Sequence, residues 1–270
     1  MPWCDIGVNF TDKRLPFESV FERALAADVK HMIITGTSLN KSQQAIQLAD
    51  QHPRHLSTTV GIHPHDANQF SAQTLNELNV LAKSNRVVAI GECGLDFNRN
   101  FSTPEQQLFA FEQQLKLACE LGLPVFLHER DAFDPQIELL TKYHKELKGG
   151  VVHCFTGNAE QMDRYLDLDL YIGITGWVCD LKRGGALRDA VKSLPINRIL
   201  LETDAPYLRP KGLANNRKVD NGNNEPAYLP YIAEELARLM ATDIDTLQAA
   251  SQDNTQTLFN IPSMSVHHAT

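Results

Sequence analysis

Carboxylate and imidazole side chains recur near the ends of short apolar stretches of this sequence. Four of them are Glu92 in "VVAIGEC" (87–93), His128 in "PVFLHER" (124–130), His153 in "GVVHCF" (150–155) and Asp204 in "RILLETDAP" (198–206). Imidazole nitrogens and carboxylate oxygens together suit a divalent cation, and incomplete protein coordination leaves an open position for water or substrate. A bound cation lowers the pKa of its water and polarises a phosphoryl or carbonyl oxygen. The four residues therefore predict metal-assisted hydrolysis, with Glu92 and Asp204 also as candidate catalytic groups.

Each residue of this set also has a structural interpretation. A histidine inside an apolar run is commonly a hydrogen-bonded core residue, and an aspartate at a strand end, such as Asp204, can cap the following helix. Asp96 is either a partner of a metal ligand or a turn residue. Cys93 and Cys154 each follow a predicted ligand directly. Because adjacent strand residues point to opposite faces, both thiols are expected to face the helix layer.

Further polar side chains follow the same strand ends and are candidates for binding substrate. His63 and His65 lie just past one apolar run, and Arg130 closes another. A guanidinium can bind phosphate through two parallel hydrogen bonds, although Arg130 could instead pair with Glu129 or Asp131.

Aromatic and basic residues are candidates for holding a nucleic acid strand. An exposed ring can stack on an unpaired base, and Trp177 is the chosen candidate, with packing as the alternative interpretation. Three more rings follow strand ends: Phe97, Phe155 and Tyr207. The irregular segment 207–226 is locally basic and either guides a strand to the site or is a solvated surface loop. Its cations are Arg209, Lys211, Arg217 and Lys218.

The candidate residues can form one site only if the fold brings the ends of their strands together. Eight short apolar runs alternate with amphipathic stretches of helical length; the runs are 4–10, 31–37, 56–65, 87–93, 124–130, 150–155, 170–177 and 198–206. Apolar strands alternating with helices indicate a parallel sheet covered on both faces, and eight such units close into a (β/α)₈ TIM barrel of the metal-dependent hydrolase type. A doubly wound open sheet is the alternative. One helix is expected to begin at a capping box formed by Ser102 and Glu105.

Composition limits the remaining possibilities. The hydrophobic fraction of 43% and charged fraction of 21% are typical of a globular protein, and the formal net charge of −8 argues against a broad surface for duplex DNA. The five cysteines are scattered, which favours a reducing compartment. No apolar run approaches a membrane span. We expect a cytoplasmic monomer with a single domain at 1–262 and a flexible tail at 263–270.

Long ordered blocks of the chain resemble the TatD family of metal-dependent deoxyribonucleases. The blocks include "GIHPHD", "AIGECGLDFNRNFSTPEQQ", "PVFLHERDA", "VVHCFTGN" and "LLETDAPYL". The resemblance implies a barrel hydrolase that removes nucleotides from the 3′ end of single-stranded DNA, and of RNA as a second substrate, in DNA repair or degradation. It also implies that Glu92, His128 and His153 are metal ligands. Asp204 matches an aspartate that either binds the metal or accepts the proton of the attacking water.

The first strand departs from the family pattern. Many members carry "D-x-H-x-H" there, whereas this chain has "DIGVN", with Gly7 and Asn9 in place of the two histidines. Asp5 and Asn9 are therefore expected to form a supporting group or a degenerate metal position. Loss of two imidazoles shifts the ligand set towards oxygen, which favours Mg²⁺, with Mn²⁺ or Zn²⁺ as alternatives.

Two other functions remain open from the sequence. Related barrels hydrolyse small esters, lactones and amides, and a fold does not decide its substrate. A non-catalytic barrel with a decayed site is the second alternative, suggested by Gly7 and Asn9.

Overall fold

The structure is a computed structural model of the 270-residue chain and describes residues 1–213 and 222–261. Eight strands form one parallel sheet in which every strand pairs with its sequence neighbours. They are β1 Trp3–Val8, β2 Val29–Ile34, β3 Leu56–Val60, β4 Val87–Asp96, β5 Val125–Arg130, β6 Gly150–Val152, β7 Tyr171–Ile174 and β8 Ile199–Leu201. The predicted TIM barrel is confirmed, and the doubly wound alternative, which requires a different strand order, is wrong.

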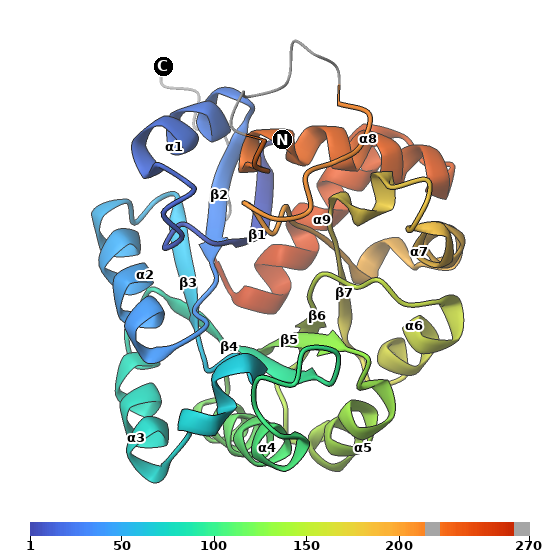
Figure 1. Ribbon diagram of the computed structural model, residues 1–270. Coiled ribbons are helices and arrows are strands. Elements are labelled where there is room, and N and C mark those ends of the chain that lie inside the picture. Colours follow the sequence, from blue (N-terminus) through green and yellow to red (C-terminus); the bar gives the residue numbers. More distant parts are fainter. Residues whose placement is uncertain (214–221, 262–270) are drawn as a thin grey trace.

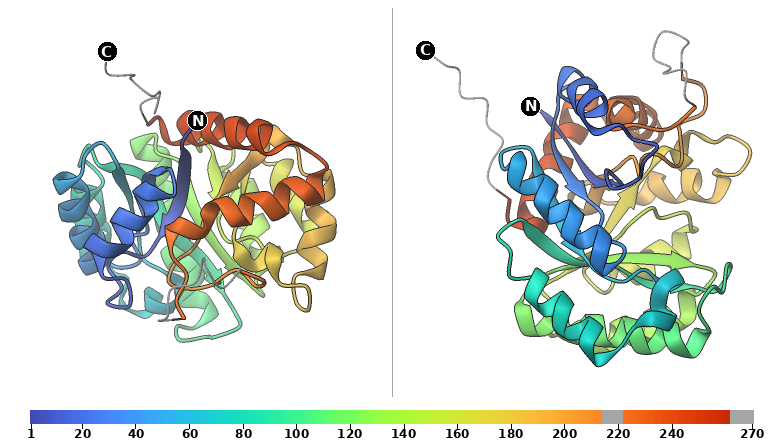
Figure 2. Two further views of the ribbon diagram at one scale, coloured as in Figure 1. Left: turned by 90° about the horizontal axis from the view of Figure 1, so that it is seen from above. Right: turned by 60° about the vertical axis from the view of Figure 1, so that its left-hand side comes forward.

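Helices surround the ring of strands (Figure 1). They are α1 Phe17–Ala26, α2 Leu39–Gln51, α3 Ala72–Leu81, α4 Pro104–Leu121, α5 Phe133–Tyr143, α6 Ala159–Leu166, α7 Gly185–Ala190, α8 Leu229–Met240 and α9 Ile244–Phe259. Short 3₁₀ helices occur at η1 Pro64–Gln69, η2 Gly176–Cys179, η3 Val191–Ser193, η4 Ile196–Arg198 and η6 Pro226–Tyr228. Views from two other directions show the same arrangement of outer helices and inner strands (Figure 2).

Alternation along the strands divides the core into two parts. In β5, Val125 and Leu127 join the apolar cluster shared with the helices, whereas Phe126 between them joins a second, smaller cluster. Ile33 and Leu200 of other strands belong to the same second cluster. Because successive strand residues point to opposite faces, this second cluster fills the interior of the barrel.

The ring closes between β1 and β8 through only a few bonds. The backbone N–H of Asp204 donates to Gly7 O at 2.9 Å, and that of Asn9 donates to Ala205 O at 2.9 Å. The buried Asp5 carboxylate accepts from the backbone N–H of Thr203 at 2.9 Å and from its hydroxyl at 2.5 Å. Asp5 therefore joins the first strand to the last.

One helix start differs from the prediction. The capping box of α4 is made by Thr103 and Gln106, one residue after the predicted pair Ser102 and Glu105. The Ser102 hydroxyl instead donates to His65 O at 3.0 Å and accepts from Asn68 N–H at 2.9 Å. Ser102 thus fixes η1 rather than the start of α4.

None of the described helices is long and apolar enough to cross a membrane. The predicted domain extent, 1–262, stays a prediction. The predicted tail 263–270 and the basic residues Arg217 and Lys218 lie outside the described residues.

Candidate metal centre

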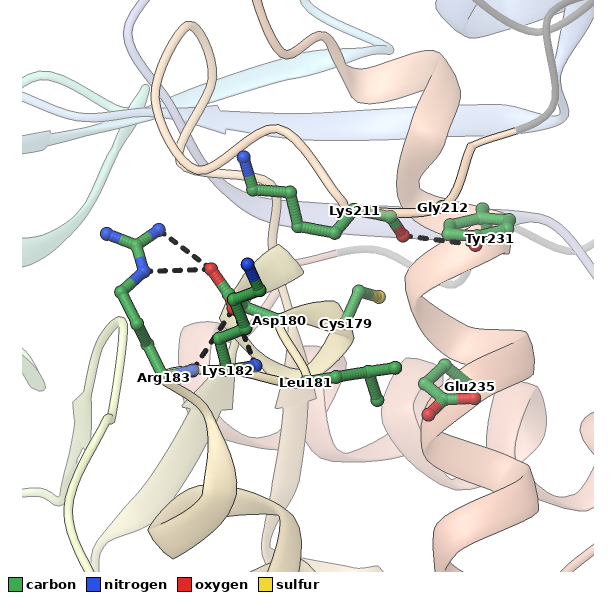
Figure 3. A pocket seen from close by; sticks show the side chains of 9 residues that line it. All are labelled: Cys179, Asp180, Leu181, Lys182, Arg183, Lys211, Gly212, Tyr231 and Glu235. Atoms are coloured by element: carbon green, nitrogen blue, oxygen red, sulfur yellow. Dashed lines mark hydrogen bonds and ion pairs between the residues drawn. The ribbon is translucent and has the colours of Figure 1, made fainter.

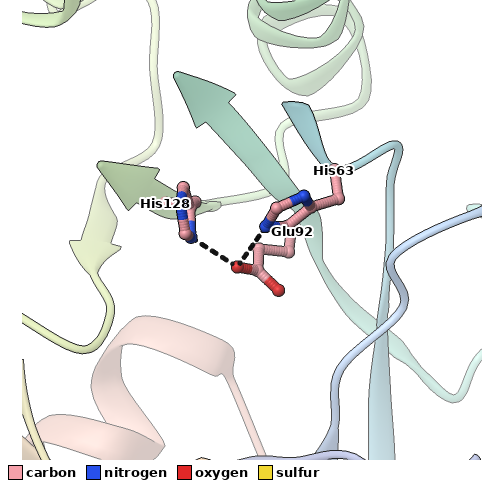
Figure 4. A group of neighbouring side chains, drawn as sticks. All are labelled: His63, Glu92 and His128. Atoms are coloured by element: carbon pink, nitrogen blue, oxygen red, sulfur yellow. Dashed lines mark hydrogen bonds and ion pairs between the residues drawn. The ribbon is translucent and has the colours of Figure 1, made fainter. Parts of the chain in front are cut away.

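Three imidazoles converge on one oxygen of Glu92 at the carboxyl ends of the strands. Glu92 Oε1 lies 2.9 Å from His128 Nδ1, 3.0 Å from His153 Nε2 and 3.4 Å from His63 Nε2. Figure 4 shows the rings of His63 and His128 pointing at this carboxylate. The carboxylate is buried, and although burial alone would raise its pKa, His153 and His63 hold the pKa of Glu92 well below its usual value. Glu92 is thus ionised at the centre of the cluster.

The orientation of His153 is fixed by a buried carboxylate behind it. His153 Nδ1 donates to Glu202 Oε2 at 3.1 Å, and the other oxygen of Glu202 accepts from the backbone N–H of Cys154. Burial alone would lower the pKa of His153, but the carboxylates of Glu202 and Glu92 outweigh it and raise the pKa well above its usual value. A cation at the centre would displace the Nε2 proton, and with its Nδ1 proton still held by Glu202 the ring would then present the Nε2 lone pair to that cation.

His63 accepts a hydrogen bond at Nδ1, whereas His153 donates one from the same nitrogen. Its Nδ1 accepts the backbone N–H of His65 at 3.1 Å, at the start of η1. Burial lowers the pKa of His63, which favours the neutral ring. A neutral imidazole that accepts at Nδ1 carries its proton on Nε2, the atom that faces Glu92. His63 is therefore placed as a hydrogen-bond donor, although one of its nitrogens lies within ligand range of Glu92 and His128.

Asp96 links the remaining two histidines. Its Oδ2 accepts from His65 Nε2 at 2.7 Å and lies 3.5 Å from His128 Nε2. Its Oδ1 accepts the backbone N–H groups of Asn98 and Arg99, so Asp96 also orders the turn after β4. Both roles that the sequence left open for Asp96 are present in one side chain.

The donor set fits a divalent cation. Donors that share an ion at about 2.1 Å lie about 3.0 Å apart at octahedral angles and about 3.4 Å apart at tetrahedral angles. The distances from Glu92 Oε1 to His128 Nδ1 and His153 Nε2, 2.9 and 3.0 Å, fall at the octahedral value. His128 Nε2, on the side of its ring that faces Asp96 rather than Glu92, is buried and lacks a hydrogen-bond partner among the described residues. A buried nitrogen without a partner is what a site for a cation presents.

Asp204 borders the same cavity from the end of β8. Its Oδ1 accepts from Asn9 Nδ2 at 3.0 Å. Burial raises the pKa of Asp204 to about 7, and the nearby His153 limits the rise. A carboxylate that exchanges its proton near neutral pH suits the role of general base.

The first-strand residues serve different purposes. Asn9 lines the cavity and holds Asp204, whereas Asp5 is buried in the seam between β1 and β8. Burial raises the pKa of Asp5 to about 7. The structure thus places Asn9, but not Asp5, at the cavity.

The two cysteines differ from each other. Cys93 is buried in the cluster shared with the helices, as predicted. The prediction for Cys154 is wrong, because this residue lines the cavity together with the candidate ligands. Its φ of 48° lies in the left-handed region, so the alternation of a regular strand ends before it. Asp204, with a φ of 53°, has the same unusual backbone. Such conformations gather at functional sites.

The cavity has a volume of about 730 Å³ and opens at the carboxyl ends of the strands. Of the predicted substrate contacts, His63, His65 and Arg130 line it. Arg130 is exposed and makes no ion pair with Glu129 or Asp131. Trp177 lines a neighbouring cavity of about 670 Å³, where the guanidinium of Arg183 lies 4.4 Å from its ring centroid.

A third cavity of about 740 Å³ lies between η2 and α8 and receives Lys211 of the basic segment (Figure 3). Its carboxylates are already occupied, because Asp180 binds Arg183 and Glu235 binds Arg188. This cavity has no histidine among its lining residues. It therefore lacks a set of groups for metal chemistry.

Sequence reasoning missed Glu202. This fully buried carboxylate lies between Gly7 and Gly173, where a Cβ atom would come within 2.4 Å and 2.6 Å of its oxygens. A signal was available in "LLETDAP", because a glutamate inside an apolar strand needs a buried partner.

The chain is similar to proteins of one family along nearly its whole length. A family model described as TatD related DNase matches residues 4–260. A Salmonella typhimurium (strain LT2) protein named 3′-5′ ssDNA/RNA exonuclease TatD is 48% identical over 259 residues, covering 95% of this chain and 98% of that protein. A solved TatD family hydrolase from Entamoeba histolytica has a TM-score of 0.86 at 28% identity, over 96% of this chain and 98% of its own. A solved TatD homologue from Escherichia coli K12 has the same TM-score at 30% identity, with the same coverage.

Proposed function

The chain belongs to the TatD-related DNase family, and on this premise we propose that it is a metal-dependent exonuclease that removes nucleotides from the 3′ end of single-stranded DNA or RNA. The observation that carries the proposal is the set of imidazoles around Glu92 Oε1. The cavity above them accepts an unpaired strand end. The acidic chain, with its net charge of −8, is poorly suited to coat duplex DNA.

The proposed metal ligands are Glu92, His128 and His153, with Asp204 beside them. A divalent cation held there supplies polarisation of a phosphoryl oxygen and a lowered pKa for bound water. We propose Mg²⁺ first, since Gly7 and Asn9 add no imidazole and the set is thereby shifted towards oxygen donors, with Mn²⁺ and Zn²⁺ as alternatives. Glu92 brings negative charge to the centre, and His153 brings an oriented lone pair.

Asp204 is the proposed proton acceptor. Its pKa of about 7 keeps a large fraction ionised at neutral pH, and the carboxylate is buried and directed by Asn9. It takes the proton as a water attacks phosphorus, while the ester bond from phosphorus to the adjoining nucleotide breaks and the oxygen of that bond leaves as a hydroxyl with a proton from solvent. General-base catalysis of this kind contributes about 10²- to 10⁴-fold in rate.

The proposed phosphate contacts are His63, His65 and Arg130. His63 offers its Nε2–H at the floor of the cavity, and Arg130 offers at the rim a guanidinium that forms no ion pair with any described residue. Stacking of a base on Trp177 stays a prediction, and the position of this ring in the neighbouring cavity would put the base away from the ligands. The monomeric state, the cytoplasmic location and a role in DNA repair or degradation also stay predictions.

The test is digestion of single-stranded DNA labelled at its 5′ or 3′ end, with Mg²⁺, Mn²⁺ or EDTA. Wild-type protein should shorten the 5′-labelled strand progressively and release labelled mononucleotide from the 3′ end, and EDTA should stop both. Glu92→Ala and His153→Ala should lose the activity. His144→Ala is the matched control, because His144 is partly exposed and, among the described residues, its ring hydrogen-bonds to Thr141 O.

Two outcomes would contradict the proposal. Activity retained in both Glu92→Ala and His153→Ala would place the chemistry elsewhere. Absence of shortening by wild-type protein with every metal would redirect the search to small esters, lactones and amides.

A further inference from the structure

Large exposed aromatic side chains are rare on this protein, and two of them border the cavity. Among the described residues, the exposed members of Phe, Tyr and Trp are Phe101 (61% exposed), Phe109 (53%) and Tyr207 (48%). Phe101 and Tyr207 line the cavity with the candidate metal ligands, whereas Phe109 lies on the outer surface of α4. A single exposed ring needs no explanation, but two rings at one cavity indicate a binding surface.

The two rings lie on opposite walls. Phe101 belongs to the segment after β4, and Tyr207 to the segment after β8. These strands are four apart in either direction around the ring of eight, so the segments face each other across the mouth. The candidate ligands lie at the floor between them.

Each ring is held by a neighbour that leaves much of it uncovered. Phe101 and the His65 ring form a T-shaped pair, at 4.8 Å between centroids and an interplanar angle of 83°. The guanidinium of Arg14 covers one face of Tyr207 at 4.5 Å from the centroid, and Arg14 is itself anchored by Asp12 at 2.7 Å. Both rings are therefore positioned before a ligand arrives, which reduces the entropy lost on binding.

Cations surround the same cavity and suit the phosphates of a strand. Lys41, Arg99 and Arg130 are exposed and line it, with the acidic groups Asp66 and Glu129 among the other lining residues. The carboxylate of Glu129 is already engaged, because it accepts the backbone N–H of Ala132 at 2.7 Å. Aromatic rings combined with cations are the usual means of binding unpaired nucleotides, since every base has a face on which to stack.

We propose that Phe101 and Tyr207 form a clamp that stacks on the two bases flanking the scissile phosphodiester, one ring per base. The proposal rests on the proposed exonuclease function and adds the groups that hold the bases. The clamp would also explain a preference for single-stranded substrate, because the paired and stacked bases of a duplex have no free face for a ring on each wall.

The test uses single-stranded DNA in which a tetrahydrofuran abasic nucleotide replaces either the last or the second-last nucleotide at the 3′ end. For wild-type protein, each replacement should raise KM by about 5- to 150-fold, the range expected for one stacked base, with kcat changed far less. Phe101→Ala should abolish the dependence on one of these positions, and Tyr207→Ala the dependence on the other. Phe101→Trp and Tyr207→Phe should restore it, since both keep a ring.

Phe109→Ala is the matched control, and it should behave as wild type. Mn²⁺ affinity measured by calorimetry should stay within about twofold in all variants, because neither ring supplies a metal ligand. If wild-type protein digests normal and abasic strands with equal KM, the clamp is wrong and the proposed function still stands. The clamp is also wrong if Phe101→Ala and Tyr207→Ala both remove the effect of the same abasic position on KM. An effect of Phe109→Ala as large as that of Phe101→Ala would also overturn it. Failure of wild-type protein to digest the normal strand would instead overturn the proposed function.

Discussion

Replacement of Glu202 by glutamine tests how the metal centre is supported. The two oxygens of Glu202 accept from His153 Nδ1 and from the backbone N–H of Cys154. Glutamine keeps the shape but supplies one oxygen and one NH₂ group. The NH₂ group cannot face the fixed backbone donor of Cys154, so it must face His153.

The consequence for His153 follows from its two nitrogens. If Nδ1 has to accept from the glutamine, the neutral ring carries its proton on Nε2, 3.0 Å from Glu92 Oε1. That nitrogen then has no lone pair for a cation. The side chain cannot turn to avoid the conflict, because the backbone at Gly7 and Gly173 lies close against the carboxylate on two sides. Loss of such a supporting carboxylate weakens metal binding by about 10- to 100-fold, or about 1.4 to 2.7 kcal/mol.

The assay is calorimetric titration of metal-free protein with Mn²⁺. Glu202→Gln should raise Kd by about 10- to 100-fold, and excess Mn²⁺ should recover part of the nuclease activity. The matched control is Glu235→Gln, which alters a glutamate paired with Arg188 and Arg238 on the outer helix layer. Thermal unfolding in EDTA checks that both variants fold. An Mn²⁺ Kd for Glu202→Gln within about twofold of wild type would refute the assigned tautomer of His153.

Three further predictions concern single side chains. Asp204→Asn should lower kcat/KM by about 10²-fold or more. It should also remove the loss of activity that wild-type protein shows below about pH 7 in a pH profile. The reason is that burial raises the pKa of Asp204 to about 7, and a bound cation can only lower this pKa. His63→Ala should lower kcat/KM by about 10-fold or more while changing the Mn²⁺ Kd by less than about threefold; a loss of Mn²⁺ affinity equal to that of His128→Ala would make His63 a ligand. Burial raises the pKa of Asp5 to about 7, from about 4 in the unfolded chain. Folding therefore takes up a proton at pH values between about 4 and about 7, and the free energy of unfolding falls as the pH rises through this range. Asp5→Asn should therefore gain up to a few kcal/mol relative to wild type between pH 4 and pH 8, measured by urea unfolding, and parallel curves would contradict this.

The sequence predicted the barrel and the grouping of its polar strand ends for the same physical reason. Apolar runs alternating with helices predict parallel strands, and parallel strands place their carboxyl ends on one side. Glu92, His128 and His153 could therefore be grouped without knowledge of any contact, and the structure brings His128 and His153 within 3.0 Å of one oxygen of Glu92.

Features that depend on local backbone or distant packing could not be predicted. Cys154 faces the cavity because its φ is positive, and alternation along a strand does not foresee this. Asp5 stabilises the seam between the first and last strands, which lie at opposite ends of the sequence. Phe101 follows β4 in a loop, where no periodicity indicates which way a ring points.

The Glu202 carboxylate occupies the space that a side chain on residue 7 of the first strand would need. This contact connects the unusual sequence "DIGVN" to the metal centre. A Cβ atom on residue 7 would lie 2.4 Å from Glu202 Oε2, so a side chain there excludes the carboxylate that orients His153. We therefore expect Gly7→His to weaken Mn²⁺ binding by about 10-fold or more, although it adds an imidazole. Gly7→Ala, which adds the Cβ atom without a ligand, should weaken binding in the same direction. Calorimetry of both variants decides the matter: tighter Mn²⁺ binding by Gly7→His would mean that the first strand can still supply a ligand, and that Glu202 is not needed to orient His153.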